Sequence, residues 1–432
     1  MNALNVENLP LESLLPYARN ARTHSREQVR QIARSIREFG FLVPVLIDRE
    51  GTIIAGHGRV LAAKQIGLER IPALRVEHLT EAQVKAYRIA DNRIALNAGW
   101  DESLLRIEIQ ELISVDVDPI ILGFPQGELD VLISDRDDAE ESPFPSPPSP
   151  DETVTQPGDI WLLGEHRVLC GDCRDSDAVA QLMQGKRARM VITDAPYNVR
   201  IDGHVSGLGQ HTHAEFQMAS GEMSSEEFVR FLVETVGVAS SVCVDGALLY
   251  LFMDWRHLPE LYAACAQLKL SPVNLAVWSK TGAGMGSLYR SQHELVLIVK
   301  KGSAPHINNV QLGKHGRYRS NVWTYAGQNT FGAARDEALA AHPTVKPTAL
   351  IRDAILDVTN FGDLIFDGFL GSGTAVLAAE QARRRCFGIE IEPRYVDVTL
   401  LRWIAATGQQ PVHLRSGETF AVRRERVAAE VA

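Results

Sequence analysis

Cysteine is scarce in this chain of 432 residues, which contains five of them. An odd, small number in so long a chain argues against a disulfide framework and favours a reducing compartment. Long hydrophobic runs are absent as well: no stretch reaches the roughly eighteen apolar residues of a membrane span. The first residues, MNALNVENLPLESLL, lack the basic flank and apolar stretch of a signal peptide. We therefore expect a cytoplasmic protein.

Basic residues are also outnumbered by acidic ones: the chain has 44 Lys and Arg and 54 Asp and Glu. The net charge of −10 counts against a nucleic-acid partner, since phosphate binding needs local positive charge. The charge is unevenly spread, however. Residues 135–152 contain seven acids and one Arg, whereas residues 301–346 contain six basic residues and two acids. Total charge therefore does not exclude DNA.

The acidic segment, residues 135–153, reads DRDDAEESPFPSPPSPDET and has almost no apolar pattern. Such a segment cannot bury enough surface to order itself, and its prolines favour an extended linker. It separates residues 1–134 from residues 154–425. A division is also expected because 432 residues exceed what one hydrophobic core usually holds.

The first part mixes helix and strand patterns. REQVRQIARSIREF has its apolar residues on one helical face, and Gly40 follows it as a C-cap glycine would. VPVLID and TIIAG then predict a hairpin, and GHGRVLAAKQIG predicts a turn into a helix. Beyond Pro72 the pattern is mostly helical up to Ile133. We predict a small α/β domain with a helical extension.

The second part alternates strand and helix patterns. WLLG and RVLCGD favour a strand pair, and MVITD, ALLYLFMD, VNLAVWSK, HELVLIVKK, DLIFD and CFGIEI are typical of further strands. Helix patterns separate most of them, and Ser224 with Glu227 forms a capping box for one. Strands separated by helices imply a parallel, doubly wound sheet, so the predicted fold class is α/β.

One strand-turn-helix segment, FDGFLGSGTAVLAAE at residues 366–380, favours a ligand site. Gly371 and Gly373 let the backbone approach a ligand, and the helix start offers free N–H groups. Glu390 ends the next strand, where a carboxylate accepts ribose hydroxyls in nucleoside-binding sheets. A tight turn without a ligand is the alternative. The glycines match neither a dinucleotide fingerprint nor a P-loop.

Four motifs of the second part carry a family resemblance. DAPY at residues 194–197 is similar to the catalytic Asp/Asn/Ser-Pro-Pro-Tyr/Phe/Trp motif of amino-group DNA methyltransferases, and DGFLGSG at residues 367–373 to their cofactor motif. HPTVKP at 342–347 and LCGDC at 169–173 match two further motifs, in the order of the β class. The resemblance implies a Rossmann-like, doubly wound methyltransferase domain that uses S-adenosylmethionine.

The resemblance also implies a role for each DAPY residue. The exocyclic amine of adenine is a poor nucleophile, because its lone pair is delocalised into the ring. The Asp194 carboxylate and the Ala195 carbonyl would hold both amino hydrogens. Pro196 would fix that carbonyl, and Tyr197 would stack on a base that has left the duplex. Methyl transfer is then a direct displacement that depends on positioning and electrostatics.

The first residue of the DAPY motif, Asp194, indicates which base is methylated. In this family Asp tends to accompany adenine N6 and Ser cytosine N4, so Asp194 favours adenine, with cytosine N4 as the alternative. Ala195 stands where Pro is usual. Only its backbone carbonyl is needed, so we expect activity with a looser loop. An ordinary strand-end Asp before a Pro turn is the alternative for this motif alone.

The family implies several contacts to the cofactor. Asp172 would contact its adenine, and Lys346 and Thr374 would help hold its methionine part, although each is alternatively a plain cap or surface residue. The full predicted cofactor set is Asp172, Lys346, Asp367, Phe369, Gly371, Gly373, Thr374 and Glu390.

Residues 302–341 occupy the place of the β-class recognition region. Basic residues beside aromatic ones suit phosphate contact with base stacking, so we predict DNA contacts from Lys314, Arg317 and Arg319. A solvated basic loop is the alternative. Replacement of the two arginines with unchanged cofactor binding would separate the two interpretations.

No metal site is expected. Cys170 and Cys173 have redox or metal spacing, but no second pair completes a zinc site, and we interpret them as inert. Three histidines lie in the polar segment 200–222, which we interpret as an active-site loop.

Residues 8–95 resemble the N-terminal domain of ParB-like partition proteins, a fold shared with sulfiredoxin. TIIAGHGRVLAAKQIGLERIPAL carries the resemblance. The Gly-Glu-Arg-Arg box, which binds nucleotide phosphates in ParB, stands here as Gly56-His57-Gly58-Arg59, without the Glu and the first Arg. We predict a phosphate site at Gly56, Gly58 and Arg59 for a nucleotide or for DNA; a tight turn is the alternative.

The sequence thus predicts an adenine-specific DNA methyltransferase tethered to a ParB-like module. Its expected ligands are DNA and S-adenosylmethionine, with a nucleotide at the first domain and a homodimer as further possibilities. A DNA-binding regulator with an inactive methyltransferase domain is the alternative. Against it stands the joint presence of Asp194, Tyr197, Gly371, Gly373 and Glu390. The recognition sequence and a restriction-nuclease partner stay open.

Overall fold

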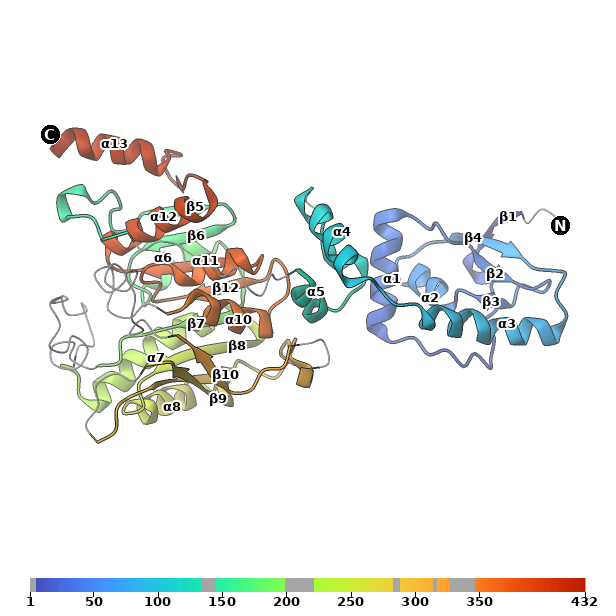
Figure 1. Ribbon diagram of the computed structural model, residues 1–432, viewed down its shortest axis with the longest axis horizontal. Helices are drawn as coiled ribbons and strands as arrows, with labels where there is room; N and C mark the ends of the chain where they lie inside the picture. Colours follow the sequence, from blue (N-terminus) through green and yellow to red (C-terminus); the bar gives the residue numbers. More distant parts are fainter. Residues whose placement is uncertain are drawn as a thin grey trace. The chain divides into compact units, whose positions relative to one another are not determined.

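The computed structural model describes residues 5–115, 117–133, 145–198, 221–282, 288–313, 317–326 and 346–431. The chain forms two compact units, Met1–Ser134 and Asp135–Ala432, coloured from blue to teal and from teal to red in Figure 1. Within the described ranges no helix has the length and hydropathy needed to span a membrane.

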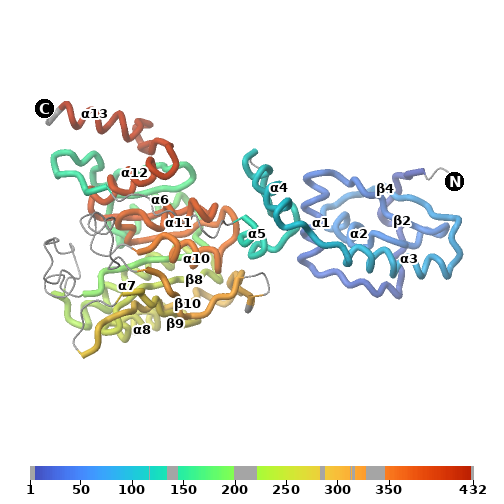
Figure 2. Tube along the Cα trace, in the orientation of Figure 1, coloured from blue at the N-terminus to red at the C-terminus, as the bar shows by residue number. Residues whose placement is uncertain are grey.

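The first unit is built on a four-stranded sheet of order β1-β4-β2-β3. Strand β4 pairs antiparallel with β1 and parallel with β2. Helix α1 packs on α2 (Figure 2). Helix α3 packs against β3 (Figure 1). The elements of this core are β1 (Val6–Pro10), η1 (Leu11–Ser13), α1 (Arg26–Phe39), β2 (Val45–Ile47), β3 (Ile53–Ala55), α2 (His57–Gln65), β4 (Arg70–Arg75) and α3 (Glu81–Ile94).

Helix α1 follows directly from its sequence. The Ser25 side chain accepts a hydrogen bond from the backbone N–H of Gln28 and caps the helix start. Gly40 ends the helix with φ of 81°, the left-handed region that favours glycine. Ala33 and Ile36 are buried on one face. The predicted helix and its C-cap glycine are confirmed.

A helical extension follows the first sheet. It consists of η2 (Ala95–Asn97), α4 (Glu102–Ser114), η3 (Pro119–Leu122) and α5 (Gln126–Ile133). The Asp101 carboxylate caps α4 by accepting from the N–H groups of Ser103 and Leu104. Ile109 and Leu129 are buried at 1% and 0% exposure, α4 packs against α5, and η3 packs against α1.

The second unit contains a ten-stranded sheet of order β11-β9-β10-β8-β7-β12-β13-β6-β5-β14. The central strands β8, β7, β12, β13 and β6 run parallel, and β10 runs antiparallel to both of its neighbours. The strands are β5 (Ile160–Leu163), β6 (His166–Cys170), β7 (Ala188–Thr193), β8 (Cys243–Met253), β9 (Ser271–Lys280), β10 (His293–Lys300), β11 (Val322–Tyr325), β12 (Leu364–Asp367), β13 (Arg385–Glu390) and β14 (Val412–His413).

Helices cover both faces of this sheet, and alternate strand residues enter two separate cores. In β7, Val191 packs with residues of α6, α7 and α8, whereas Ile192 packs with residues of α10, α11 and α12. The predicted doubly wound α/β fold is therefore present. The remaining elements are η4 (Pro150–Glu152), α6 (Ser176–Met183), α7 (Ser225–Ser241), α8 (Leu258–Gln267), η5 (Gln311–Gly313), α10 (Thr348–Val358), α11 (Thr374–Gln381), α12 (Pro393–Thr407) and α13 (Phe420–Val431).

Only the end of the predicted linker, residues 135–153, can be described, because 135–144 lie outside the described residues. Residues 145–153 include η4, whose Ser149 and Glu152 form a capping box. The Arg394 side chain donates to the carbonyl of Pro148 at 2.7 Å. This end of the linker is thus held on the second unit.

Candidate active site

The DAPY motif and the glycine turn at residues 367–373 follow neighbouring strands, at the point where the chain switches between the two faces of the sheet. Strands β7 and β12 are neighbours, but the helix after β7 is α7 on one face and the helix after β12 is α11 on the other. Such a switch point leaves a crevice at the carboxyl ends of the strands. The Thr193 hydroxyl, at the end of β7, donates to the Asp367 carboxylate at 2.8 Å. One hydrogen bond therefore joins the catalytic and cofactor loops.

The glycine turn after β12 is tightly built. Gly371 and Gly373 have φ of 56° and 84°, and a Cβ on Gly373 would lie 2.5 Å from Cγ2 of Thr399. The N–H of Gly371 donates to Glu390 Oε2 at 2.7 Å, and the N–H of Phe369 donates to Asp367 at 3.1 Å. The start of α11 is thereby held beside two buried carboxylates.

Those two carboxylates are costly to ionise. Burial raises the pKa of Asp367 to about 7 and the pKa of Glu390 to about 7, although backbone N–H groups partly oppose the shift. A buried carboxylate gains from each further donor that approaches it. The hydroxyl groups of a ribose are donors of that kind, as the predicted role of Glu390 requires.

The structure separates the remaining predicted cofactor residues. Asp172 follows β6, and its carboxylate is paired with Arg174 at 2.7 Å. The Thr374 hydroxyl accepts from the buried Arg402 guanidinium at 3.3 Å, which favours a structural role. Lys346 is ion-paired with Asp194, the predicted catalytic aspartate.

Asp194 is held by two donors. The Tyr197 hydroxyl donates to its Oδ1, and the Lys346 ammonium donates to its Oδ2. The hydroxyl also lies 3.2 Å from Glu294 Oε2. Burial raises the pKa of Asp194, and the Lys346 charge opposes that shift. The aspartate side chain is 22% exposed, so it retains access to solvent.

Glu294 and Lys280 belong to this cluster although sequence reasoning missed both. Glu294 Oε1 lies 2.6 Å from the Lys280 ammonium, and its Oε2 lies 3.1 Å from that of Lys346. Burial alone would raise the pKa of Glu294, but the two ammonium groups outweigh it and hold the pKa at about 2. The sequence signal that could have pointed to Glu294 is its position in HELVLIVKK, directly before a run of five apolar residues typical of a buried strand.

The geometry of β10 explains the position of Glu294. Because β10 runs antiparallel to β8, its beginning lies at the edge where β7 and β8 end. Pairing of His293 with Ser279 brings Lys280 to the same edge. An expectation of uniformly parallel strands places the start of β10 at the opposite edge, away from Asp194.

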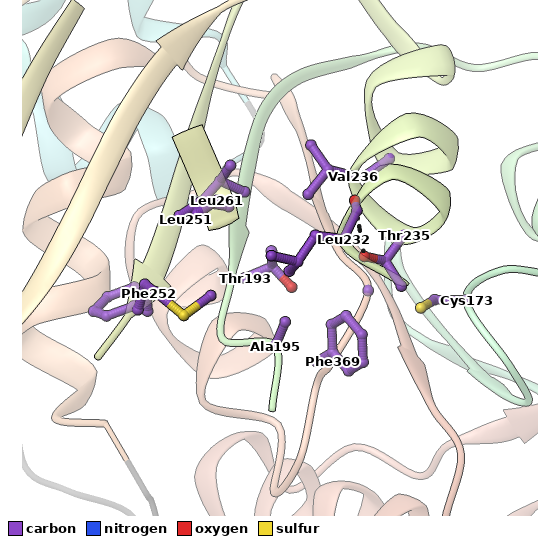
Figure 3. A pocket seen from close by; sticks show the side chains of 13 residues that line it. Cys173, Thr193, Ala195, Leu232, Thr235, Val236, Leu251, Phe252, Leu261 and Phe369 are labelled. Carbon is purple, nitrogen blue, oxygen red and sulfur yellow. Dashed lines mark hydrogen bonds between the residues drawn. The ribbon is translucent and has the colours of Figure 1, made fainter. Parts of the chain in front are cut away.

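An apolar pocket joins the catalytic and cofactor loops (Figure 3). Ala195 and Phe369 lie next to each other in it, with Thr193 and Leu232 along the wall. The Thr235 hydroxyl donates to the carbonyl of Phe231 at 3.0 Å, so it leaves no unsatisfied donor in the pocket. The lining is apolar, and most of its residues belong to the core between the sheet, α7 and α8.

The two described residues of the predicted DNA contact, Arg317 and Arg319, are ion-paired. Lys314 lies outside the described residues. The Arg317 guanidinium pairs with Asp357 at 2.6 Å, and Arg319 pairs with Asp357 at 2.8 Å and with Asp353 at 3.1 Å. These carboxylates belong to α10 and neutralise both arginines. In the structure these ion pairs join the β11 region to α10. A phosphate would have to compete with the two carboxylates, and the DNA contact stays a prediction.

Both cysteines of the CGDC motif are buried free thiols. Burial raises the pKa of Cys170 and of Cys173 to about 12, so both stay protonated. Among the described residues no cluster of His, Cys, Asp and Glu is arranged to hold a metal. The three histidines of the predicted active-site loop lie in 199–220, outside the described residues.

In the first unit, Gly56 caps the start of α2 with φ of 104°. A Cβ on Gly58 would lie 3.0 Å from the Ile32 side chain, so Gly58 serves the packing of α2 on α1. Arg59 is partly buried, and its Nε has no hydrogen-bond partner among the residues described. Burial first, and then the nearby His24 and Arg88, lower the pKa of His57. Arg59 and Arg88 thus bring positive charge to this helix start, with Asp91 as a nearby carboxylate.

Comparison with known families assigns three segments of the chain. The DNA methylase family of N6 and N4 amino-methyltransferases matches residues 188–401. The ParB N-terminal domain family matches residues 1–92. A helix-turn-helix domain of ParB-methyltransferases matches residues 103–157, which include α4 and α5. Sequence reasoning described this last segment only as a helical extension and a linker.

Two sequence relatives agree with this division. The ParB-like nuclease domain-containing protein YnaK of Escherichia coli is 54% identical over 74 residues, 17% of this chain and 85% of YnaK. The DNA adenine methyltransferase YhdJ of E. coli is 24% identical over 255 residues, 52% of this chain and 80% of YhdJ. The crystal structure of an M1.HpyAVI–SAM complex is 18% identical, with a TM-score of 0.39, and covers 55% of this chain and 98% of that one. The chain therefore joins a ParB N-terminal domain to a DNA methylase domain of the N6/N4 amino-methyltransferase family.

Proposed function

We propose that this DNA methylase transfers the methyl group of S-adenosylmethionine to the N6 amine of adenine within a specific DNA sequence. The observation that carries the proposal is the junction of Asp194 with the glycine turn through the Thr193–Asp367 hydrogen bond. It sets an acceptor for an amine beside a turn suited to a nucleoside-bearing cofactor, at the switch point of the sheet.

The residues around the turn fit the cofactor. The free N–H groups at the start of α11 and the raised pKa of Glu390 suit a ligand with ribose hydroxyls. Phe369 and Ala195 offer apolar surface between the two loops. S-adenosylmethionine, when bound, supplies a methyl group on a sulfonium sulfur.

The chain's own residues then position the target. Asp194 and the Ala195 carbonyl hold the two amino hydrogens, which directs the nitrogen lone pair away from the ring. Tyr197 stacks on the flipped base. In the displacement the methyl carbon would leave sulfur, which keeps the electron pair of the broken bond, and the amine nitrogen would then carry a surplus proton for which the Asp194 carboxylate is the adjacent acceptor. Catalysis thus depends on positioning and electrostatics.

Adenine is favoured over cytosine by Asp194 itself, because Asp accompanies adenine N6 in this family whereas Ser accompanies cytosine N4. Cytosine N4 is the second candidate, since the matched family includes enzymes of both kinds. Methyl label transferred to unmethylated DNA, followed by digestion to nucleosides, separates them. Label in 6-methyladenine supports the proposal. Label in 4-methylcytosine would show that cytosine N4, and not adenine N6, is the methylated amine.

The first unit is proposed to bind a phosphate group at the start of α2. The partly buried Arg59 with its unpartnered Nε, beside the positively charged surroundings of His57, supports this assignment. Titration of the whole chain with CTP and ATP, repeated with Arg59→Ala, tests it. Saturable binding that Arg59→Ala abolishes is expected, and absence of millimolar-range binding to wild type would contradict a nucleotide ligand.

A further inference from the structure

Both oxygens of the Asp194 carboxylate are engaged in the structure. Tyr197 donates to Oδ1 and Lys346 to Oδ2. Under the proposed function one of these oxygens has to receive one hydrogen of the target amine, while the Ala195 carbonyl receives the other. A donor already bonded there competes with the amine for these oxygens, and a buried donor that gives way destabilises the complex unless another acceptor is at hand.

Glu294 offers an acceptor to both donors through a single atom. Its Oε2 lies 3.1 Å from the Lys346 ammonium and 3.2 Å from the Tyr197 hydroxyl. Its other oxygen is bonded to Lys280 at 2.6 Å, which fixes the direction of the carboxylate. The Lys346 side chain is 8% exposed, so water is a poor substitute for this acceptor.

The charges of the cluster also depend on Glu294. Lys280 and Lys346 face Asp194 and Glu294, two positive and two negative groups. Without Glu294 the pair of ammonium groups would have Asp194 as the remaining carboxylate of this cluster. Lys346 would then be held on Asp194 more firmly, and the target amine would have to displace it.

We propose that Glu294 is a positioning residue of the methyl-transfer site: it takes over Lys346 and the Tyr197 hydroxyl from Asp194 as the target base enters, and so frees Asp194 to hold the amine. The inference rests on the proposed function. It places Lys346 next to the target base. Lys346 would then make no direct contact with the methionine part of the cofactor.

The test compares the wild-type 432-residue chain with Glu294→Gln, Lys346→Met and the double variant. Single-turnover transfer of labelled methyl from S-adenosylmethionine to unmethylated genomic DNA gives the rate, and titration calorimetry gives the cofactor Kd. Glutamine keeps the volume of the side chain but removes its charge. Asp159→Asn is the matched control, because Asp159 is an ion-paired carboxylate, 15% exposed, beside β5 near the other edge of the sheet.

Glu294→Gln is expected to lower the rate on the order of 10- to 100-fold with unchanged cofactor Kd, since a hydrogen bond to a charged group is lost. In the Lys346→Met background the same substitution is expected to lower the rate far less, because the ammonium that Glu294 must receive is gone.

Equal losses in both backgrounds would overturn the inference, as would weaker cofactor binding by Glu294→Gln or an equal rate loss in Asp159→Asn. A wild-type protein that transfers no methyl to any base would instead overturn the proposed function, and the inference with it.

Discussion

The hydroxyl of Thr193 donates to the carboxylate of Asp367 at 2.8 Å, across 174 positions of the chain. Thr193 ends β7 and Asp367 ends β12, so this bond ties the loop that would hold the base to the turn that would hold the cofactor. Both residues are buried, at 7% exposure each. The bond therefore fixes the relative position of two sites that are far apart in sequence.

Replacement of Thr193 by Val removes this donor and keeps the shape of the side chain. Asp367 then retains the N–H of Phe369 as a donor, and the loss is expected to lower the free energy of unfolding by about 1–3 kcal/mol. Urea unfolding measures it. The control is Thr235→Val, whose hydroxyl bonds to carbonyls of its own helix. Equal stability of Thr193→Val and wild type would contradict a structural tie.

Gly373→Ala is expected to damage the glycine turn more than Gly408→Ala. Both positions have positive φ, 84° and 70°. A Cβ on Gly373 would lie 2.5 Å from Thr399, whereas a Cβ on Gly408 meets nothing within 4 Å. The φ alone costs about 1 kcal/mol in either variant. Cofactor titration should show weaker binding only for Gly373→Ala, and parallel behaviour of the two variants would speak against a packed turn.

The raised pKa of Glu390 predicts a pH dependence of stability. In the folded protein this carboxyl keeps its proton up to about pH 7, whereas the unfolded chain releases it near pH 4 to 5. The folded state thus binds more protons in between, and stability falls as pH rises through that window. Glu390→Gln does not titrate there.

Urea unfolding of wild type and Glu390→Gln from pH 5 to pH 8 isolates this contribution. The free energy of unfolding of wild type is expected to drop relative to the variant as pH rises, on the order of 2 kcal/mol in total. Groups that do not interact with Glu390 titrate equally in both proteins and cancel in the difference, whereas the Glu390 charge also raises the pKa of Asp367 and so adds to the effect. Parallel curves would show that Glu390 is not buried as described.

Arg317→Ala is expected to affect stability and not DNA contact. The substitution leaves Asp357, 6% exposed, without one of its two arginine partners. Breaking a buried ion pair in this way costs about 3–5 kcal/mol. Unfolding and DNA binding are measured on the same preparation. Lower DNA affinity with wild-type stability would support the phosphate contact predicted from the sequence.

Much of the second unit was accessible from the sequence, because its strand and helix patterns differ clearly and its motifs follow a known order. The capping box at Ser224 and Glu227 is present as predicted, and so is the strand pair that turns between Leu163 and His166. The glycine turn and the DAPY motif fall at neighbouring strand ends because parallel strands all end at one edge.

The side-chain partners were not accessible in the same way. Glu294 joins the site only because β10 is antiparallel, and periodicity does not reveal strand direction. Arg317 and Arg319 suggested phosphate contact, but their carboxylate partners lie some 34 to 40 positions later on α10. The helix-turn-helix segment was missed because its short helices have no distinctive motif of their own.

The most direct test of the account is transfer of labelled methyl from S-adenosylmethionine to unmethylated DNA by wild type and by Asp194→Ala, with cofactor binding measured for both. The account predicts 6-methyladenine from wild type, loss of the label in Asp194→Ala, and retained cofactor binding in the variant. Unchanged transfer by Asp194→Ala, or a wild-type protein that binds the cofactor and labels no base, would contradict it.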